Sequence, residues 1–337
     1  MEKIIRIGLD TSKSVFQLHG VDGSERVVLR RRLSRRQIRK FFADLPPTLI
    51  GMEACGASHH WARLLRELGH EVRLLPPQYV KPYVKRGKND AADAEAICEA
   101  MSRPSMRFVP VKTAENQAAL MLHGGRELLI KQRTMLVNAI RGHAAEFGIV
   151  SAQGQSGIKE LLSEIQGHED VPALANELFA SLADQLESLE KKIRALETKL
   201  MAWHRNDPRS RQLATIPGIG PITATALTMK VADPGQFQSA RHFAAWLGLT
   251  PKDHSTAGRQ RLGVITRAGD ETLRSLLVAG ATTLVRHAKP GRSSPWLLAL
   301  LTRKPKKLAA VAQANKTARI AWAVMMSGGT YQRPSLT

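Results

Sequence analysis

Four acidic residues in the first third of the chain are spaced in a way that suits metal binding. Asp10 follows one short apolar run and Glu53 follows another, as expected for residues at the ends of buried strands. Asp90 and Asp93 are three residues apart at the expected start of a helix, so they share one helix face. Mg²⁺ and Mn²⁺ prefer oxygen ligands, and two-metal phosphoryl transfer needs several converging carboxylates. The pattern therefore predicts a divalent-metal site.

Each of these acids also has an ordinary structural interpretation. Asp10 could stabilise the turn after its strand, and Asp90 could be a helix N-cap with Asp93 in the first helical turn. The surrounding region is richer in cations than in acids. We therefore favour metal binding when the four acids are considered together.

Two neighbouring hydroxyl side chains in the C-terminal half form a second candidate site. Ser255 and Thr256 precede Gly258 in a segment that is rich in cations. These cations are Lys252, Arg259 and Arg261. A lone hydroxyl pair in a loop normally stabilises a turn, but cations could instead hold a phosphate against the hydroxyl. The segment is thus a candidate phosphate-binding loop with a nucleophile.

A glycine- and proline-containing segment lies between these two sites. Residues 216–221 read IPGIGP, which is typical of a helix-hairpin-helix turn. Gly218 and Gly220 would let the backbone approach a DNA phosphate, and the next helix would offer free N–H groups. Such contacts position DNA without reading its sequence. The alternative is a plain tight turn between two core helices.

The composition indicates a polyanionic partner. The chain has 337 residues, which is enough for about two domains. Its 50 Lys and Arg against 29 Asp and Glu give a formal charge of +21, an excess typical of nucleic-acid-binding proteins. Seven of the eleven residues from Arg30 to Lys40 are basic, although such a cluster could also be a solvated helix face.

Several other classes of protein are disfavoured. The sequence has no apolar run near the ~20 residues of a membrane span and no signal-peptide pattern. Cys55 and Cys98 have no metal-binding or redox spacing, and the phosphate-binding loop of ATP-driven motors is absent. We expect a cytoplasmic protein with no membrane partner.

The elements that must position the acids alternate between strands and helices. Three strands are expected first, followed by alternating helices and strands, which is the order of an RNase H-like α/β domain. The expected strands are Ile4–Leu9, Val15–His19, Val27–Arg31, Thr48–Met52 and Val72–Leu75, and the expected helices are Ser34–Asp44, Ser58–Leu68 and Asp90–Met101.

The rest of the chain is expected to be mainly helical. A long helix over Thr113–Phe147 and a linker over Ser151–Gly157 precede a heptad seam. The seam residues are Leu182, Leu186, Leu189, Ile193, Leu196 and Leu200. The seam could pair within the chain as a helical hairpin, or it could be a coiled-coil arm for oligomerisation. Further helices are expected over Glu271–His287 and Leu308–Met326, which gives domains at 1–112, 113–205 and 206–330.

The order of these motifs resembles that of the DEDD transposases of bacterial insertion sequences, the bridge-RNA (seeker-RNA) guided recombinases. The motifs are IGLDTSK, GMEACG, GKNDAADA, IPGIGPITA and LTPKDHSTAGRQRLGVITRAGD, and they span nearly the whole chain. The resemblance implies a RuvC-like N-terminal domain in which Asp10, Glu53, Asp90 and Asp93 bind metal. It also implies a C-terminal transposase domain with a nucleophilic serine.

The resemblance leaves two candidates for the nucleophile. Ser255 matches the serine by its distance from Gly269, whereas a count from Thr250-Pro251 reaches Thr256. We favour Ser255.

The resemblance also implies several partners. They are double-stranded DNA at the element ends and target, a non-coding guide RNA, and further copies of the chain in a dimer or tetramer. It further implies association with the nucleoid. Two other functions remain open: a Holliday-junction resolvase-like nuclease that activates water, and a DNA-binding protein without catalysis.

Overall fold

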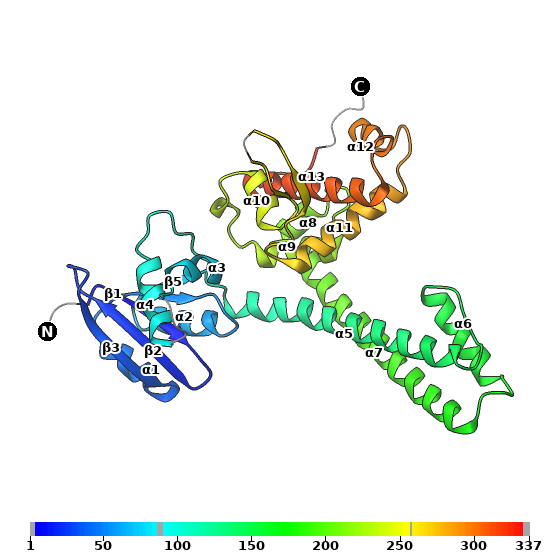
Figure 1. Cartoon of the computed structure of the whole chain (residues 1–337), viewed down its shortest axis with the longest axis horizontal. Helices are drawn as coiled ribbons and strands as arrows, with labels where there is room; N and C mark the ends of the chain where they lie inside the picture. The colour runs from blue at the N-terminus through cyan, green and yellow to red at the C-terminus, as the bar shows by residue number, and fades with distance from the viewer. Residues whose placement is uncertain (1–3, 86–89, 257, 333–337) are drawn as a thin grey trace. The chain divides into compact units, whose positions relative to one another are not determined.

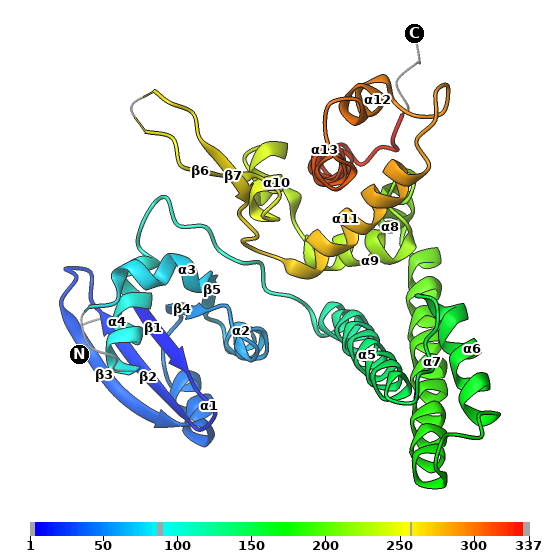
Figure 2. The same cartoon turned by 45° about the vertical axis from the view of Figure 1, so that its right-hand side comes forward.

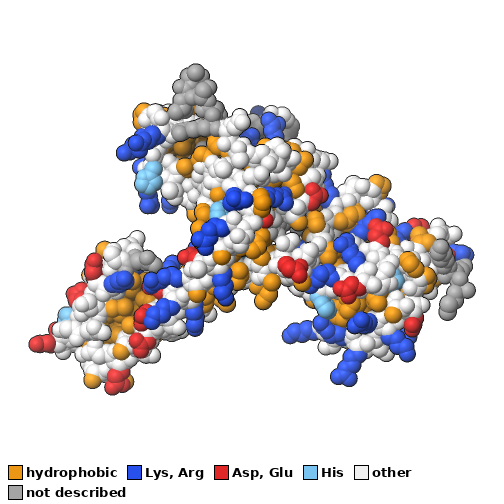
Figure 3. Space-filling model, turned by 180° about the vertical axis from the view of Figure 1, so that it is seen from behind, with side chains coloured by type: hydrophobic (Ala, Val, Ile, Leu, Met, Phe, Trp, Pro, Cys, Tyr) orange, Lys and Arg blue, Asp and Glu red, His pale blue; other side chains and the backbone are white. Residues whose placement is uncertain are grey.

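A computed structural model describes residues 4–85, 90–256 and 258–332 of the chain. The chain forms two compact units, Met1–Gln117 and Ala118–Thr337. No helix in the described residues is both long enough and apolar enough to cross a bilayer. Lys and Arg side chains are spread over both units on the face drawn in Figure 3, in keeping with the strongly positive charge.

The first unit is built on a five-stranded mixed sheet in the order β3-β2-β1-β4-β5 (Figure 1). The strands are β1 (Arg6–Thr11), β2 (Val15–Val21), β3 (Val27–Ser34), β4 (Leu49–Glu53) and β5 (Glu71–Leu75). The first three form an antiparallel meander, and β4 and β5 continue from β1 in parallel. The α/β prediction is confirmed, and each strand lies within a few residues of its expected position.

Helices cover both faces of this sheet. They are α1 (Arg35–Ala43), α2 (Ser58–Glu67), α3 (Pro77–Val80), the 3-10 turn η1 (Lys81–Tyr83) and α4 (Asp90–Ala100). Phe16 and Leu18 of β2 pack with Ile38 and Phe42 of α1 in the main core. The start of α1 is fixed as expected, because the Ser34 N–H donates to the Gln37 side chain at 2.8 Å.

Two glycines allow α4 to lie directly on the opposite face of the sheet. Gly8 of β1 and Gly51 of β4 are register partners. A Cβ on Gly8 would be 2.1 Å from the Ala94 carbonyl oxygen, and one on Gly51 would be 2.6 Å from the Met101 sulfur. A larger residue at Gly8 would clash with the α4 backbone, whereas one at Gly51 would displace side chains. Gly8 therefore sets the distance between α4 and β1, the strand that carries Asp10.

Long helices form the first part of the second unit. They are α5 (Ala114–Ala145), α6 (Gln155–Gln166) and α7 (Ala173–Asn206), with α6 lying against α7 (Figure 2). Leu136 and Ile140 of α5, Leu161 of α6, and Leu186 and Leu189 of α7 share one core. The heptad seam is thus used within the chain, as the hairpin interpretation requires.

The linker before α6 is shorter than the sequence predicts. The sequence predicts a linker over Ser151–Gly157, whereas α6 begins at Gln155. Gly154 precedes this helix with a φ of 106°, a conformation that glycine adopts without strain. A short helix directly after a polar, Gly- and Ser-containing segment is not apparent from composition.

The remainder of the second unit is mainly helical, as expected. Its helices are α8 (Pro208–Leu213), α9 (Pro221–Lys230), the 3-10 turn η2 (Pro234–Gln236), α10 (Ala240–Trp246), α11 (Glu271–Arg286), α12 (Pro295–Leu301) and α13 (Lys306–Ser327). An antiparallel hairpin of β6 (Pro251–Asp253) and β7 (Leu262–Ile265) projects from this core. The hairpin was not predicted, because its strands are short and exposed and therefore lack an alternating apolar pattern.

Candidate active site

Three of the four predicted metal ligands converge at one point in the first unit. Asp10 lies near the end of β1, and Asp90 and Asp93 lie in the first turn of α4. One carboxylate oxygen from each lies within 4.8 Å of the others. Asp10 and Asp93 are half-buried and Asp90 is exposed. This donor set of oxygens suits a hard divalent cation.

Glu53, the fourth predicted ligand, lies beside this cluster. It is the last residue of β4, the parallel neighbour of β1, and is not part of the group within 4.8 Å. Burial raises the pKa of Glu53, and the charges of Asp10 and Asp93 raise it further. The carboxylate is therefore close enough to sense the cluster electrostatically.

Repulsion between like charges marks the cluster as a site that favours a cation. The pKa of Asp10 is raised from 3.8 to about 6, first by burial and then by the charges of Asp93 and Asp90. A hydrogen bond from the Thr11 backbone opposes this shift. Half-buried carboxylates with this mutual repulsion are stabilised when a cation neutralises them. The residues present thus fit a divalent metal ion.

Ser255 lies near the tip of the β6–β7 hairpin in the second unit and is exposed. Its hydroxyl oxygen accepts a hydrogen bond from the Arg261 N–H at 3.0 Å, and its own N–H donates to Asp253 Oδ1 at 2.9 Å. Hydrogen bonds from the Ser255 side chain and backbone hold the pKa of Asp253 below its usual value. Asp253 is thus an ionised hydrogen-bond partner of the candidate nucleophile.

Asp253 is a functional candidate that the sequence interpretation missed. The spacing Asp-x-Ser, in which an aspartate accepts from the backbone two residues later, is a known turn signal and could have indicated it. Thr256, the alternative nucleophile, instead pairs through its backbone with Arg259 across the hairpin. Ser255 and Thr256 thus differ in their side-chain environments.

The base of the hairpin is fastened to the helical core. A Cβ on Gly248 would be 2.3 Å from the Ala268 carbonyl oxygen, so the two ends of the hairpin lie in close backbone contact. Arg274 of α11 donates to the carbonyl oxygens of Leu247 at 3.1 Å and Ala268 at 3.0 Å. These contacts fix where the hairpin leaves the core.

The predicted DNA-contacting residues fall into two groups. Lys252, Arg259 and Arg261 are exposed on or beside the hairpin that carries Ser255. In the turn between α8 and α9, Gly218 has a φ of 85° and packs against α11, as a plain structural turn requires. Gly220, in contrast, faces open space at the N-cap of α9.

Family models match both units. The model described as "Transposase IS116/IS110/IS902 family" matches residues 210–296. A model of DEDD transposases of the IS110 type matches residues 7–148. The second match includes all four acids, and the first includes Ser255 and both glycines of the α8–α9 turn.

Relatives match along almost the whole chain. A Sinorhizobium fredii protein named as a transposase (y4pF/y4sB) is 62% identical over 99% of this chain and 87% of its own length. The transposase for insertion sequence element IS1328 of Yersinia enterocolitica is 39% identical over 99% of this chain and 100% of its own. The transposase for element IS1111A of Coxiella burnetii is 39% identical over 98% and 92%, respectively.

Proposed function

This chain belongs to the IS116/IS110/IS902 family of transposases, and we propose that it cleaves and rejoins DNA strands through a serine nucleophile and a carboxylate-bound metal. The observation that carries the proposal is the convergence of Asp10, Asp90 and Asp93 within 4.8 Å. The positive charge of +21 supports a polyanionic substrate.

The acids of the first unit would hold the metal. Asp10, Asp90 and Asp93 supply the closest oxygens, and Glu53 supplies a further carboxylate from the neighbouring strand. A bound Mg²⁺ or Mn²⁺ supplies Lewis-acid polarisation of a phosphate. The raised pKa of Asp10 favours its protonated form, and a bound cation would offset the repulsion and favour the ionised form.

Ser255 is the proposed nucleophile. Its hydroxyl oxygen forms a bond to the scissile phosphorus and its proton passes to the Asp253 carboxylate. The bond from phosphorus to one DNA oxygen breaks, and that oxygen takes up a proton from solvent and becomes the terminal hydroxyl of the cut strand. The resulting phosphoserine retains a phosphodiester bond. A hydroxyl from another strand then reverses the step and releases Ser255, so rejoining needs no external energy.

The surroundings of Ser255 suit a phosphate. Lys252, Arg259 and Arg261 are exposed cations that would bind the backbone near the hydroxyl, and Gly220 would bring the α9 N-terminus close to a second phosphate. Following the family resemblance, we propose that a non-coding RNA pairs with the DNA and supplies sequence recognition. We also propose that the protein acts as a dimer or tetramer, because joining two DNA ends needs more than one active site.

A denaturing gel tests the proposal. Purified protein is incubated with element-end DNA, its flanking-region RNA and Mg²⁺, beside Ser255→Ala, Thr256→Ala and Asp90→Asn. We expect a covalent protein–DNA adduct that is lost in Ser255→Ala and Asp90→Asn and kept in Thr256→Ala. Cleavage without any adduct that survives Ser255→Ala would instead identify a nuclease that uses water.

A further inference from the structure

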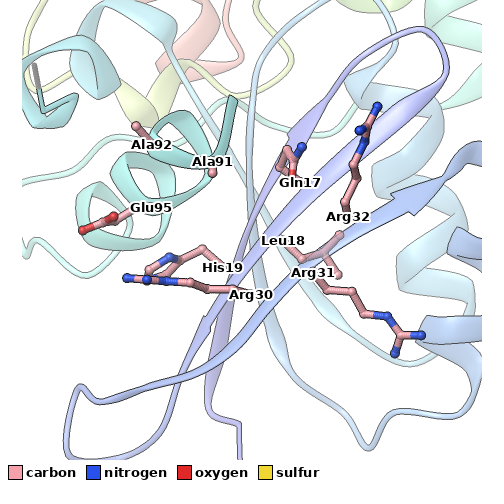
Figure 4. Close-up of a pocket in the computed structure, with 9 residues that line it drawn as sticks. All are labelled: Gln17, Leu18, His19, Arg30, Arg31, Arg32, Ala91, Ala92 and Glu95. Atoms are coloured by element: carbon pink, nitrogen blue, oxygen red, sulfur yellow. The ribbon is translucent and has the colours of Figure 1, made fainter. Parts of the chain in front are cut away.

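A groove of about 400 Å³ lies between α4 and strands β2 and β3 of the first unit (Figure 4). Gln17 and His19 of β2 and Arg30 and Arg32 of β3 line one side. Glu95 of α4 lies on the other side. The three clustered aspartates do not line the groove, but the same sheet and the same helix, α4, form both sites.

The strand register connects the groove to the metal-binding cluster. Asp10 pairs with Gln17, which in turn pairs with Arg32, so these three residues form one row across β1, β2 and β3. Residues in such a row point to the same face of the sheet. Neighbouring strands are about 4.8 Å apart, which places the Arg32 backbone roughly 10 Å from that of Asp10.

A second row confirms that this face is the one that α4 covers. Gly8 pairs with His19, and His19 pairs with Arg30. Gly8 is the glycine against which α4 packs. The helix covers β1 and β2, whereas Arg30 and Arg32 on β3 are exposed. The arginines are thus solvent-exposed on β3, two strands away from the strand that carries Asp10.

The groove is positively charged. Within the described part of the chain, neither Arg30 nor Arg32 has a hydrogen bond or ion pair that would occupy its guanidinium. Glu95 is already paired with Lys85, so its charge is neutralised locally. Burial lowers the pKa of His19 and so favours its neutral ring. Three arginines line the groove, and Arg30 and Arg32 are the two whose side chains lie on the face of the sheet that α4 covers.

We infer that Arg30 and Arg32 bind the phosphate backbone of the DNA strand that is being cleaved, next to its scissile phosphate. The inference rests on the proposed function, because it takes the acid cluster as the place where that phosphate lies. Guanidinium groups bind phosphates through paired hydrogen bonds, and the half-buried Gln17 offers an amide donor between the arginines and Asp10. A DNA strand that follows this row would contact the arginines and Gln17 before it reaches the metal site at Asp10.

The chain offers a matched control. Arg31 lies between the two arginines and also lines the groove, but its guanidinium packs over the Phe41 ring of α1 at 5.3 Å. Arg39 of α1 is exposed. Arg39→Ala removes one positive charge from the surface, half of the loss in Arg30→Ala/Arg32→Ala, without touching the groove, so it reports the effect of net charge alone.

The test is the salt dependence of binding by the full-length protein. Fluorescence anisotropy with labelled element-end DNA is measured in EDTA, so that no cleavage occurs. Each phosphate contact contributes about 0.9 to the slope of log K against log salt for duplex DNA and about 0.7 for a single strand. Between about 50 and about 200 mM salt, the wild type should therefore lose roughly 7- to 12-fold more affinity than the Arg30→Ala/Arg32→Ala variant.

Further variants separate charge from misfolding. Arg30→Lys/Arg32→Lys keeps both charges and should keep the wild-type slope, and Arg39→Ala should change the slope by less than half as much as the double alanine variant. Equal slopes for the wild type and the double alanine variant would overturn the assignment. A slope change that is larger with an RNA oligonucleotide than with DNA would also overturn it, because the groove would then hold RNA. Failure of the wild type to form an adduct would count against the proposed function instead.

Discussion

Replacement of Asp10 by asparagine is expected to stabilise the metal-free protein and to abolish its response to metal. The pKa of Asp10 is about 6 rather than 3.8, because burial and the charges of Asp93 and Asp90 disfavour its carboxylate. This difference in pKa corresponds to roughly 3 kcal/mol at most. Solvent screening of this half-buried side chain reduces the value, so we expect a gain of about 1–2 kcal/mol in the free energy of unfolding.

The pH dependence of this gain has a defined direction. The pKa of Asp10 is higher in the folded state than in the unfolded chain, so the wild type loses stability as the pH rises and Asp10 ionises. This penalty is absent below about pH 3.8, grows as the pH rises to about 6, and is complete above it. Asp10→Asn should therefore match the wild type near pH 4 and exceed it at pH 7.5.

The assay is urea unfolding in EDTA, monitored by hydrogen exchange in peptides from β1 and α4. These peptides report on the first unit by itself. Asp44→Asn, at the exposed end of α1, is the control for loss of a negative charge. Mg²⁺ at about 100 times its dissociation constant should stabilise the wild type by about 2.7 kcal/mol and leave Asp10→Asn unchanged. A less stable Asp10→Asn protein at pH 7.5 in EDTA would refute the account of repulsion in the cluster.

Three further substitutions test how the site is positioned. Gly8→Ala places a Cβ 2.1 Å from a backbone oxygen of α4. The free energy of unfolding should fall by about 1–3 kcal/mol, and titration calorimetry should show a weaker affinity for Mg²⁺. Gly56→Ala, whose Cβ would face open space, is the control and should leave both nearly unchanged. Asp253→Asn keeps the shape of the proton acceptor but not its charge, and should slow adduct formation by about 10²–10⁴-fold in single-turnover assays with unchanged DNA affinity; an unchanged rate would exclude Asp253 as the base. Arg274→Ala removes two hydrogen bonds at the base of the hairpin and should speed hydrogen exchange in β6 and β7. Arg274→Lys should partly restore the slow exchange. Unaltered exchange in Arg274→Ala would contradict the anchoring role.

The positions of the acids could be predicted because strand and helix ends leave clear signals in the sequence. The apolar runs before Asp10 and Glu53 mark β1 and β4, and Ser34 marks the start of α1. The boundaries were less accurate. Asp10 and Glu53 are among the last paired residues of β1 and β4 rather than the first residues after these strands, because backbone pairing extends beyond the apolar run.

Features that depend on tertiary packing could not be predicted. Gly8 and Gly51 are significant only because α4 lies against them, and this contact joins segments far apart in the chain. The hairpin around Ser255 is held by polar and backbone contacts without an apolar pattern, so its Asp253 contact was not foreseen. The register that aligns Arg32 with Asp10 likewise requires the sheet.

Mass spectrometry of the protein–DNA adduct tests the central claim most directly. Wild-type protein is reacted with element-end DNA, flanking-region RNA and Mg²⁺, then digested with nuclease and trypsin, and the peptide of residues 253–259 is sequenced. We predict a nucleotide phosphate linked to Ser255. A phosphate on Thr256, or cut DNA with no modified peptide, would contradict a mechanism in which Ser255 is the nucleophile.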